Sequence, residues 1–225
     1  MKKPSYLNTI YSQKFTPTGS NYPSQLAQHL IEKFNLKAGD KVLDVGCGRG
    51  DFSKALMEAG LKVSGLDREK TNTDLLSHIN VKYCDCDHEK FPFPDNSFDM
   101  VFSKSVIEHM YDPDHFMTEQ LRVLKTGGRL IILTPDWVSQ MKIFWNDHTH
   151  KRPYTVEGVR RILIIHGLKN PESRLFYQYP LYWKYPFFLL IAKILGLLGP
   201  VRKLYKNKFY RWSRELMILG TGIKN

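Results

Sequence analysis

The 225-residue sequence has few cysteines, no tandem repeat and no apolar segment following its first residues. Its three cysteines, Cys47, Cys84 and Cys86, are an odd number and too few for a disulfide framework. Free thiols are typical of a reducing compartment, so we expect a cytoplasmic protein without a secretory signal. The hydrophobic share of 42% is too high for a disordered chain. These features exclude secreted disulfide scaffolds and fibrous proteins.

The sequence also lacks an apolar run long enough to cross a bilayer. Its most apolar window lies between Pro186 and Pro200, where 13 residues would form a helix of about 20 Å, against ~30 Å for a bilayer core. Aromatic anchors, an apolar helix and a basic flank are typical of a segment that lies in the membrane interface. We therefore expect residues 181–214 to be an insertion that binds an anionic membrane surface peripherally. Covering the acceptor site or forming a homodimer are the alternatives. The flanking residues are Tyr182, Trp183 and Tyr185 before the window and Arg202, Lys203, Lys206, Lys208, Arg211 and Arg214 after it.

Acidic residues are scarce in the C-terminal part of the chain. Residues 1–141 contain 17 Lys and Arg against 18 Asp and Glu, whereas residues 142–225 contain 16 against 4. The net charge of +11 is therefore the sum of −1 and +12. Such asymmetry favours an anionic partner, either phospholipid or nucleic acid. Nucleic acid is the less favoured partner, because so apolar a helix would contribute little to phosphate binding.

The spacing of apolar residues predicts a single α/β domain over residues 1–225. Strands that alternate with helices form a parallel sheet between two helix layers. A helical lead-in over 1–37 would precede a cofactor-binding core over 41–136. The expected strands are 41–45, 61–66, 79–83, 98–103, 129–133, 174–179 and 216–219, and the expected helices are 22–35, 51–59, 73–78, 115–124 and 156–165, with Gly127 and Gly128 ending the fourth helix.

The stretch from Val42 to Gly50 contains the most informative motif. A strand leads into a loop with glycine at alternate positions, and a helix follows directly. Glycine lets the backbone approach a ligand closely, and the free N–H groups of a helix start favour a carboxylate or phosphate. The G-x-G-x-G spacing differs from the G-x-G-x-x-G of dinucleotide folds. Asp44, at the end of the strand, would repel a pyrophosphate but could pair with the ammonium group of an amino acid.

Further motifs follow in order: Gly65–Asp67, Cys84–Asp87, Phe91–Asp99, Val106–His109 and Leu121–Gly128. With these motifs the sequence resembles the class I S-adenosylmethionine-dependent methyltransferases, specifically the type 11/23-like branch. The resemblance implies a doubly wound, Rossmann-like, mostly parallel sheet of seven strands whose last strand is antiparallel. It also implies S-adenosylmethionine as the cofactor.

Within this resemblance, the glycine loop would hold the methionine part of the cofactor and Asp67 the ribose. A carboxylate after the third strand would flank the adenine; Asp85 is favoured over Asp87. A helix N-cap is the alternative role for Asp67. The expected cofactor contacts are Asp44, Gly46, Cys47, Gly48, Gly50, Asp67, Arg68, Asp85, Cys86 and Ser103.

A hydroxyl acceptor needs a base near neutral pH, and histidine is the usual one. His109 follows the fourth strand, and His148 and His150 lie in a polar loop after the fifth; each could also be structural. The loop over 147–155 resembles a branch of the family that acts on sugars and lipid-linked intermediates. We therefore expect O-methylation of a glycan or lipid-linked intermediate. A catalytically inactive cofactor-binding or scaffold protein, or a methyltransferase of small molecules or nucleic acid, is the alternative.

Two clusters contain metal-ligand residue types. Cys84-x-Cys86-x-His88 lacks the second ligand pair of a structural zinc site. Asp147, His148 and His150 are close in sequence, and neighbours of this kind rarely converge on one ion without further ligands. The sequence therefore predicts no metal site.

Overall fold

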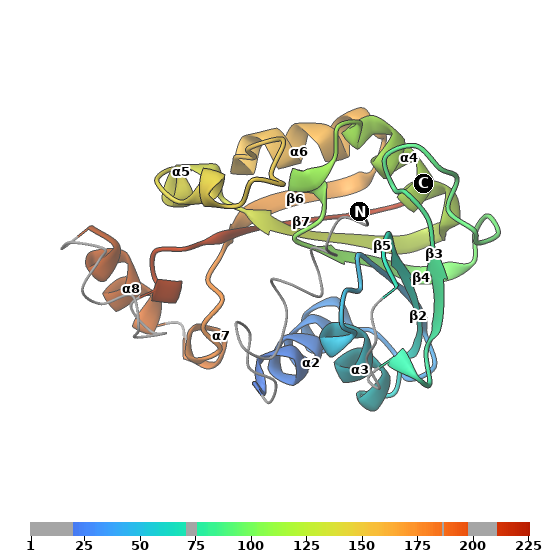
Figure 1. Cartoon of the computed structure of the whole chain (residues 1–225). Helices are drawn as coiled ribbons and strands as arrows, with labels where there is room; N and C mark the ends of the chain where they lie inside the picture. The colour runs from blue at the N-terminus through green and yellow to red at the C-terminus, as the bar shows by residue number, and fades with distance from the viewer. Residues whose placement is uncertain (1–19, 71–75, 186, 198–210) are drawn as a thin grey trace.

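The computed structural model describes residues 20–70, 76–185, 187–197 and 211–225 (Figure 1). Half of the helix expected at 73–78 lies outside these ranges, and so does the basic flank from Arg202 to Lys208. In the described ranges, every helix is too short or too polar to span a bilayer.

Seven strands form one sheet in the order β3-β2-β1-β4-β5-β7-β6. The first five strands along the chain pair in parallel, and β7 runs antiparallel to both β5 and β6. This arrangement confirms the predicted doubly wound, mostly parallel sheet with an antiparallel last strand. The strands are β1 (Lys41–Val45), β2 (Lys62–Asp67), β3 (Asn80–Tyr83), β4 (Phe98–Lys104), β5 (Leu124–Pro135), β6 (Lys169–Phe176) and β7 (Met217–Ile223).

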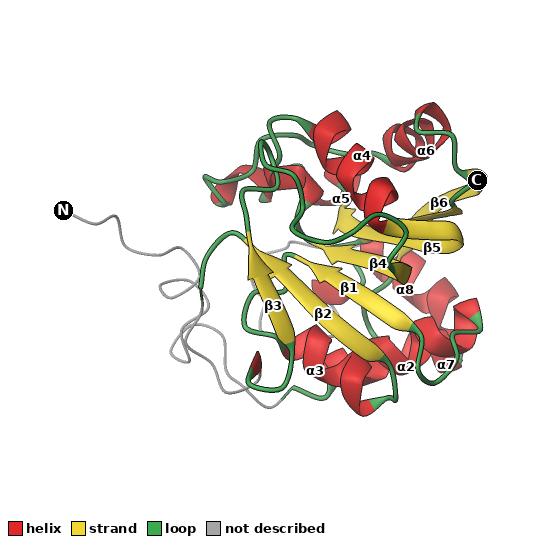
Figure 2. Ribbon diagram, turned by 90° about the vertical axis from the view of Figure 1, so that its right-hand side faces the viewer, coloured by secondary structure: helices red, strands yellow, loops and turns green. Residues whose placement is uncertain are grey.

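Helices cover both faces of the sheet, as Figures 1 and 2 show. The α4 and α6 helices lie over one face, and α2 and α3 lie over the other. The helices are α2 (Tyr22–Phe34), α3 (Asp51–Glu58), α4 (Pro113–Val123), α5 (Trp137–Gln140), α6 (Val156–Ile165), α7 (Leu181–Lys184) and α8 (Phe188–Leu197), with short 3-10 helices η2 (Ile107–His109) and η3 (Phe144–Asn146).

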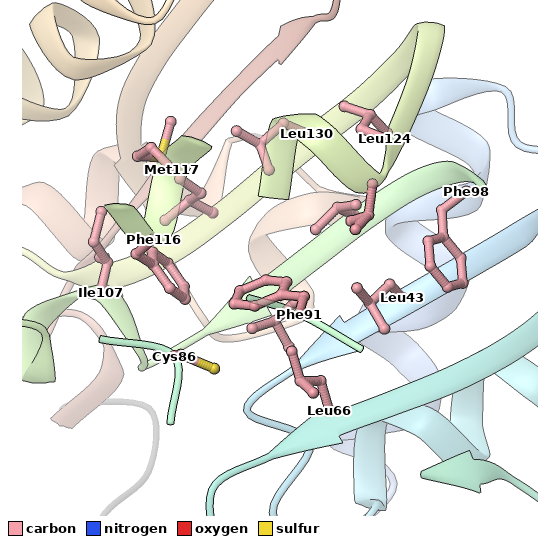
Figure 3. Close-up of a cluster of buried hydrophobic side chains, with 14 of the residues drawn as sticks. Leu43, Leu66, Cys86, Phe91, Phe98, Ile107, Phe116, Met117, Leu124 and Leu130 are labelled. Carbon is pink, nitrogen blue, oxygen red and sulfur yellow. The ribbon is translucent and has the colours of Figure 1, made fainter. Parts of the chain in front are cut away.

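The strands supply two hydrophobic cores because successive side chains point to opposite faces. Along β5, Leu130 and Ile132 join the core beneath α4 and α6, whereas Ile131 and Leu133 join the core beneath α2 and α3. Figure 3 shows the first core, with Leu43 of β1 and Leu130 among its buried side chains. This two-sided burial explains why the central strands read as continuous apolar runs.

The fifth strand begins earlier than expected. Gly127 and Gly128 do not end α4, because the helix ends at Val123 and Leu124 is already extended. The Gly127 N–H donates to the carbonyl of Lys224, and the Lys224 N–H donates to the carbonyl of Gly128. A side chain at Gly128 would overlap Leu124 and the carbonyl oxygens of Lys125 and Asp99, so packing within β5 and against β4 requires glycine here. The expected strand at 129–133 is therefore the central part of a longer strand.

The sixth strand is also displaced from its prediction, since β6 covers 169–176 in place of 174–179. Gly167 ends the preceding helix with φ at 71°, and the strand starts two residues later. As the edge strand of the sheet, β6 exposes Lys169 and Arg174 and buries only Phe176. Because its sequence is polar, a search for apolar runs does not detect this strand.

Part of the expected insertion packs inward. Tyr182 is only 2% exposed, and its hydroxyl hydrogen-bonds to that of Ser213 at 2.6 Å. The Trp183 ring stacks on His29 of α2 at 4.6 Å between centroids. The prediction of Tyr182 as a membrane anchor is therefore wrong, because burying its ring in the domain removes apolar surface from water. Trp183 is half-buried, and its role as an anchor stays a prediction. Of the three aromatics, Tyr185 alone is exposed.

Candidate active site

The loop from Gly46 to Gly50 joins β1 to α3 at the carboxyl edge of the sheet. Gly46, Gly48 and Gly50 have φ angles of 73°, 56° and 89°, in the left-handed region that favours glycine. A Cβ at Gly46 would overlap the side chain of Val106, whereas a Cβ at Gly48 would meet no atom within 4 Å. Gly46 is thus required by packing, and the open space beside Gly48 allows a ligand to approach the backbone.

Asp67, the last residue of β2, is connected directly to this loop. Its Oδ2 accepts a hydrogen bond from the Gly48 N–H at 2.8 Å, and its Oδ1 accepts one from the Glu69 N–H at 3.0 Å. Burial raises the pKa of this carboxyl, and the backbone hydrogen bonds oppose that rise. No helix begins in the described residues 68–70, so Asp67 is not a helix N-cap there. Through the hydrogen bond to Gly48, the predicted ribose contact lies beside the predicted methionine contact.

Asp44 lies beneath the same loop. Its side chain is buried on the α3 side of the sheet, where Oδ2 accepts a hydrogen bond from the Ser53 hydroxyl at 2.5 Å. Burial raises the pKa of Asp44 to about 7; the Ser53 hydrogen bond opposes the shift and the nearby Asp67 carboxylate adds to it. A bound ammonium group would stabilise the ionised carboxylate. Asp44 therefore suits the amino-acid end of a ligand.

The two carboxylates after β3 differ in their contacts. The Asp87 carboxylate accepts hydrogen bonds from the Tyr111 and Asp112 N–H groups at 2.8 and 3.0 Å, so it holds the loop that precedes α4. Asp85 caps the Asp87 N–H through Oδ1, and its Oδ2 lies 3.6 Å from Arg68. Asp87 therefore has a structural task, which favours Asp85 as the predicted residue beside the adenine.

Three of the predicted cofactor residues are buried nearby. Cys47 is buried, and burial raises the pKa of its thiol. Cys86 is also buried and shares a thiol hydrogen bond with Cys84. Ser103 pairs with Val45 in the β1–β4 register, and its buried hydroxyl has no hydrogen-bond partner among the described residues. A buried hydroxyl without a partner is costly, so it fits a site that a polar ligand completes.

These features fit S-adenosylmethionine. The glycine loop leaves open space at the backbone, Asp44 matches an ammonium group, and Asp67 can accept from ribose hydroxyls. The roles of the individual residues stay predictions.

A second cluster lies at the ends of β4 and β5. One ligand atom each of Glu108, His109 and His150 lies within 4.8 Å of the others, and the two imidazole centroids are 4.9 Å apart. The carbonyl of Glu108 accepts from the N–H groups of Lys151 and Arg152, which fastens the loop carrying His150 to η2. Among the described residues, this cluster brings together two of the three predicted histidines and leaves out His148.

The hydrogen bonds around this cluster fix the imidazole tautomers. The Thr149 hydroxyl donates to Asp147 Oδ1 at 2.6 Å, so its oxygen accepts from Nδ1–H of His109 at 2.9 Å. His150 Nδ1–H donates to the carbonyl of Phe144 at 2.7 Å. Both rings therefore carry their proton on Nδ1 and a lone pair on Nε2. Burial lowers the pKa of His109, which keeps that imidazole neutral near pH 7.

Sequence reasoning missed Glu108. The side chain is 0% exposed; its Oε2 accepts from the Thr134 hydroxyl at 3.0 Å, and its Oε1 has no hydrogen-bond partner among the described residues. Burial raises the pKa of this carboxyl to about 7. Its position before His109 is visible in the sequence, but its contact with the loop that carries His150 is a tertiary feature.

Comparison with known proteins agrees with these features. Residues 43–132 match a family described as a methyltransferase domain. A ubiquinone/menaquinone biosynthesis C-methyltransferase from Stenotrophomonas maltophilia is 31% identical over 166 residues, which cover 60% of this chain and 64% of that protein. The sequence is thus similar to class I S-adenosylmethionine-dependent methyltransferases.

Other methyltransferases are also similar to this chain. The 27-O-demethylrifamycin SV methyltransferase of Amycolatopsis mediterranei is 32% identical over 120 residues, covering 48% of this chain and 43% of that protein. A methyltransferase structure from Archaeoglobus fulgidus shares the fold, with a TM-score of 0.65 at 21% identity over 96% of this chain and 98% of that one. The chain spans less than two thirds of the length of either curated relative.

Proposed function

We propose that this chain transfers the methyl group of S-adenosylmethionine to a hydroxyl of a glycan or lipid-linked intermediate. The observation that carries the proposal is the pair of imidazoles, His109 and His150, whose centroids lie 4.9 Å apart after β4 and β5. Val106 connects the two regions, because it packs against Gly46 and directly precedes η2. The proposed cofactor site and the two imidazoles thus share one edge of the sheet.

The bound cofactor supplies an electrophilic methyl group on a sulfonium. The residues of this chain then have to hold the acceptor in line and remove its proton. As the acceptor oxygen forms its bond to the methyl carbon, the carbon–sulfur bond breaks and the hydroxyl proton passes to Nε2 of His109 or His150. The products are the methyl ether, S-adenosylhomocysteine and an imidazolium, which returns its proton to water.

The names of the relatives indicate three kinds of acceptor atom. The rifamycin enzyme is an O-methyltransferase by the name of its substrate, the quinone enzyme methylates carbon, and a relative from Arabidopsis thaliana methylates nitrogen of phosphoethanolamine. Among these, a hydroxyl is the acceptor that most needs a neutral base near pH 7, because its own pKa is high. The two imidazoles therefore favour oxygen.

A lipid-linked acceptor is supported by the surface around α8. Phe187 and Leu190 are 73% and 58% exposed, and Lys184 and Lys193 lie beside them. In Figure 1, α8 lies at the same end of the molecule as α5, which directly follows β5 and leads toward the His150 loop. An anionic membrane at this end would present its lipids on the side from which the acceptor enters.

Transfer of labelled methyl from S-adenosylmethionine to glycan and lipid extracts tests the activity. We expect His109→Ala and His150→Ala each to lower kcat by about 10²-fold or more at pH 7 while the Kd of the cofactor stays unchanged. His148→Ala is the matched control from the same loop and should retain turnover. Full turnover in both of the first two variants would remove base catalysis by these residues and favour another acceptor atom.

A catalytically inactive relative would behave differently in the same assay. It would bind the cofactor, and Asp67→Ala would weaken that binding by removing charge-assisted hydrogen bonds of ~1.5–3 kcal/mol. It would transfer no methyl group to any extract. Cofactor binding without transfer would therefore favour a cofactor sensor or scaffold.

Liposome co-sedimentation tests the membrane part. We expect binding to anionic vesicles that weakens with salt and with Leu190→Glu, because each engaged Lys or Arg contributes ~1 kcal/mol within a Debye length of ~8–10 Å. Equal binding to neutral vesicles would contradict the electrostatic part. A dimer in solution that Leu190→Glu dissociates, without vesicle binding, would assign the surface to a homodimer.

A further inference from the structure

The Glu108 carboxylate has one buried oxygen for which the fold provides no donor. Oε2 is satisfied by Thr134, while Oε1 lies at zero exposure without a hydrogen bond from any described residue. Leaving a buried carboxylate oxygen without a partner is costly unless a cation or a proton completes it. The side chains that face this carboxylate therefore indicate what could complete it.

Two imidazoles converge on the same carboxylate. Their Nδ1 atoms are already engaged, in one case with Thr149 and in the other with the carbonyl of Phe144. The Nε2 atoms of His109 and His150 therefore carry lone pairs with no hydrogen-bond partner among the described residues. A hydrogen bond at the other ring nitrogen is the arrangement that orients metal-binding histidines in proteins.

We propose that Glu108, His109 and His150 form a binding site for a divalent transition metal such as Zn²⁺ or Co²⁺. Two imidazoles and one carboxylate are a three-ligand set that leaves coordination positions open for water or an exogenous oxygen. Imidazole nitrogen favours Zn²⁺, Co²⁺ and Ni²⁺ over Mg²⁺ and Ca²⁺, which prefer oxygen ligands. The sequence analysis considered Asp147, His148 and His150 and predicted no metal site; the proposed site keeps His150 and combines it with Glu108 and His109.

The distances require a small adjustment. Ligands held at about 2.0–2.2 Å from one ion lie roughly 3–3.6 Å from one another, whereas one ligand atom from each of the three side chains lies within 4.8 Å of the others. Binding would therefore draw the side chains together by about an ångström, and both half-buried imidazoles can turn about their ring torsions.

The charges around the cluster have opposite signs. Lys104 is the positive neighbour of Glu108, and Asp147 is a negative one.

An ion on both Nε2 atoms would leave neither histidine able to take a proton. The metal-bound form and the form that could act as a base therefore exclude each other.

Metal binding can be read without methyl transfer, which separates this proposal from the proposed function. The full chain, free of any histidine tag and stripped with a chelator, is titrated with Zn²⁺ by calorimetry and with Co²⁺ by visible absorbance. We expect one ion per chain, d–d bands typical of Co²⁺ with nitrogen and oxygen ligands, and no response to Mg²⁺.

Three variants test the ligand set. We expect His109→Ala and His150→Ala each to weaken Zn²⁺ binding by about tenfold or more, and His148→Ala, the matched loop control, to bind as tightly as the wild type. Glu108→Gln keeps the shape of the buried side chain and should also weaken binding. Wild-type protein that binds no more tightly than the His109→Ala/His150→Ala double variant, with both shown to be folded by circular dichroism, would overturn the proposal. Absence of Co²⁺ bands in the wild type would do the same.

Discussion

Asp44 offers a sharp test of the cofactor site because its burial links ligand binding to pH. The carboxyl is almost fully buried beneath the glycine loop, and its pKa is raised to about 7. At pH 6 most of the protein therefore carries a neutral Asp44, whereas at pH 8 most of it carries a carboxylate. The ammonium group of the proposed ligand pairs only with the carboxylate, so binding at pH 6 has to include the loss of one proton.

The size of the effect follows from this linkage. With a pKa near 7, the ionised fraction falls from about 0.9 at pH 8 to about 0.09 at pH 6, so Kd increases about tenfold, which is about 1.4 kcal/mol. In Asp44→Asn the carboxylate is absent, so binding should be weaker at pH 8 by about tenfold or more and nearly independent of pH. In Ser53→Ala the hydroxyl that stabilises the carboxylate is lost, so the midpoint should move to higher pH.

Calorimetry with S-adenosylhomocysteine at pH 6, 7 and 8 measures these constants without turnover. The difference between wild type and Asp44→Asn isolates this residue from Asp67, whose pKa is also raised. A wild-type Kd that is the same at pH 6 and pH 8 would refute the linkage. An unchanged tenfold dependence in Asp44→Asn would assign it to another group.

The remaining predictions concern stability. The pKa of Asp44 in the folded protein, about 7, lies above its value in the unfolded chain. The stability that Asp44 contributes is therefore present at acid pH and is lost as the pH rises toward 7. At pH 8, Asp44→Asn should accordingly raise the Tm of the unliganded protein. Gly46→Ala and Gly48→Ala both place a side chain at a positive φ, which strains the backbone. Only the alanine at position 46 would overlap Val106, so Gly46→Ala should lower the Tm more. Gly48→Ala should chiefly weaken cofactor binding. Leu43→Ala, at a fully buried position, should destabilise the protein by ~2–5 kcal/mol in urea unfolding. Equal Tm values for the two glycine variants, or a loss below ~1 kcal/mol for Leu43→Ala, would contradict these packing arguments.

The glycine loop and its contact with Asp67 could be predicted because their signals are local. A strand, its glycine loop and the following helix are contiguous in sequence, and the parallel sheet places the end of β2 beside the end of β1. The hydrogen bond from Gly48 to Asp67 is the direct result of that register. The boundaries of β5 and β6 were mispredicted because both strands pair with distant residues. The start of β5 hydrogen-bonds to Lys224, and β6 pairs with β7 at the edge of the sheet.

The histidine cluster could be predicted only in part, because it is assembled from two segments about 40 residues apart. His109 comes with η2, whereas His150 reaches it through a loop that the carbonyl of Glu108 holds by two N–H groups. Spacing therefore identifies the histidines as candidates but does not select which two meet, and it gives no sign of the buried carboxylate beneath them. The glycine loop, in contrast, is contiguous with its strand and helix, so a substitution in the 147–155 loop changes the histidine cluster without changing the sequence of the glycine loop.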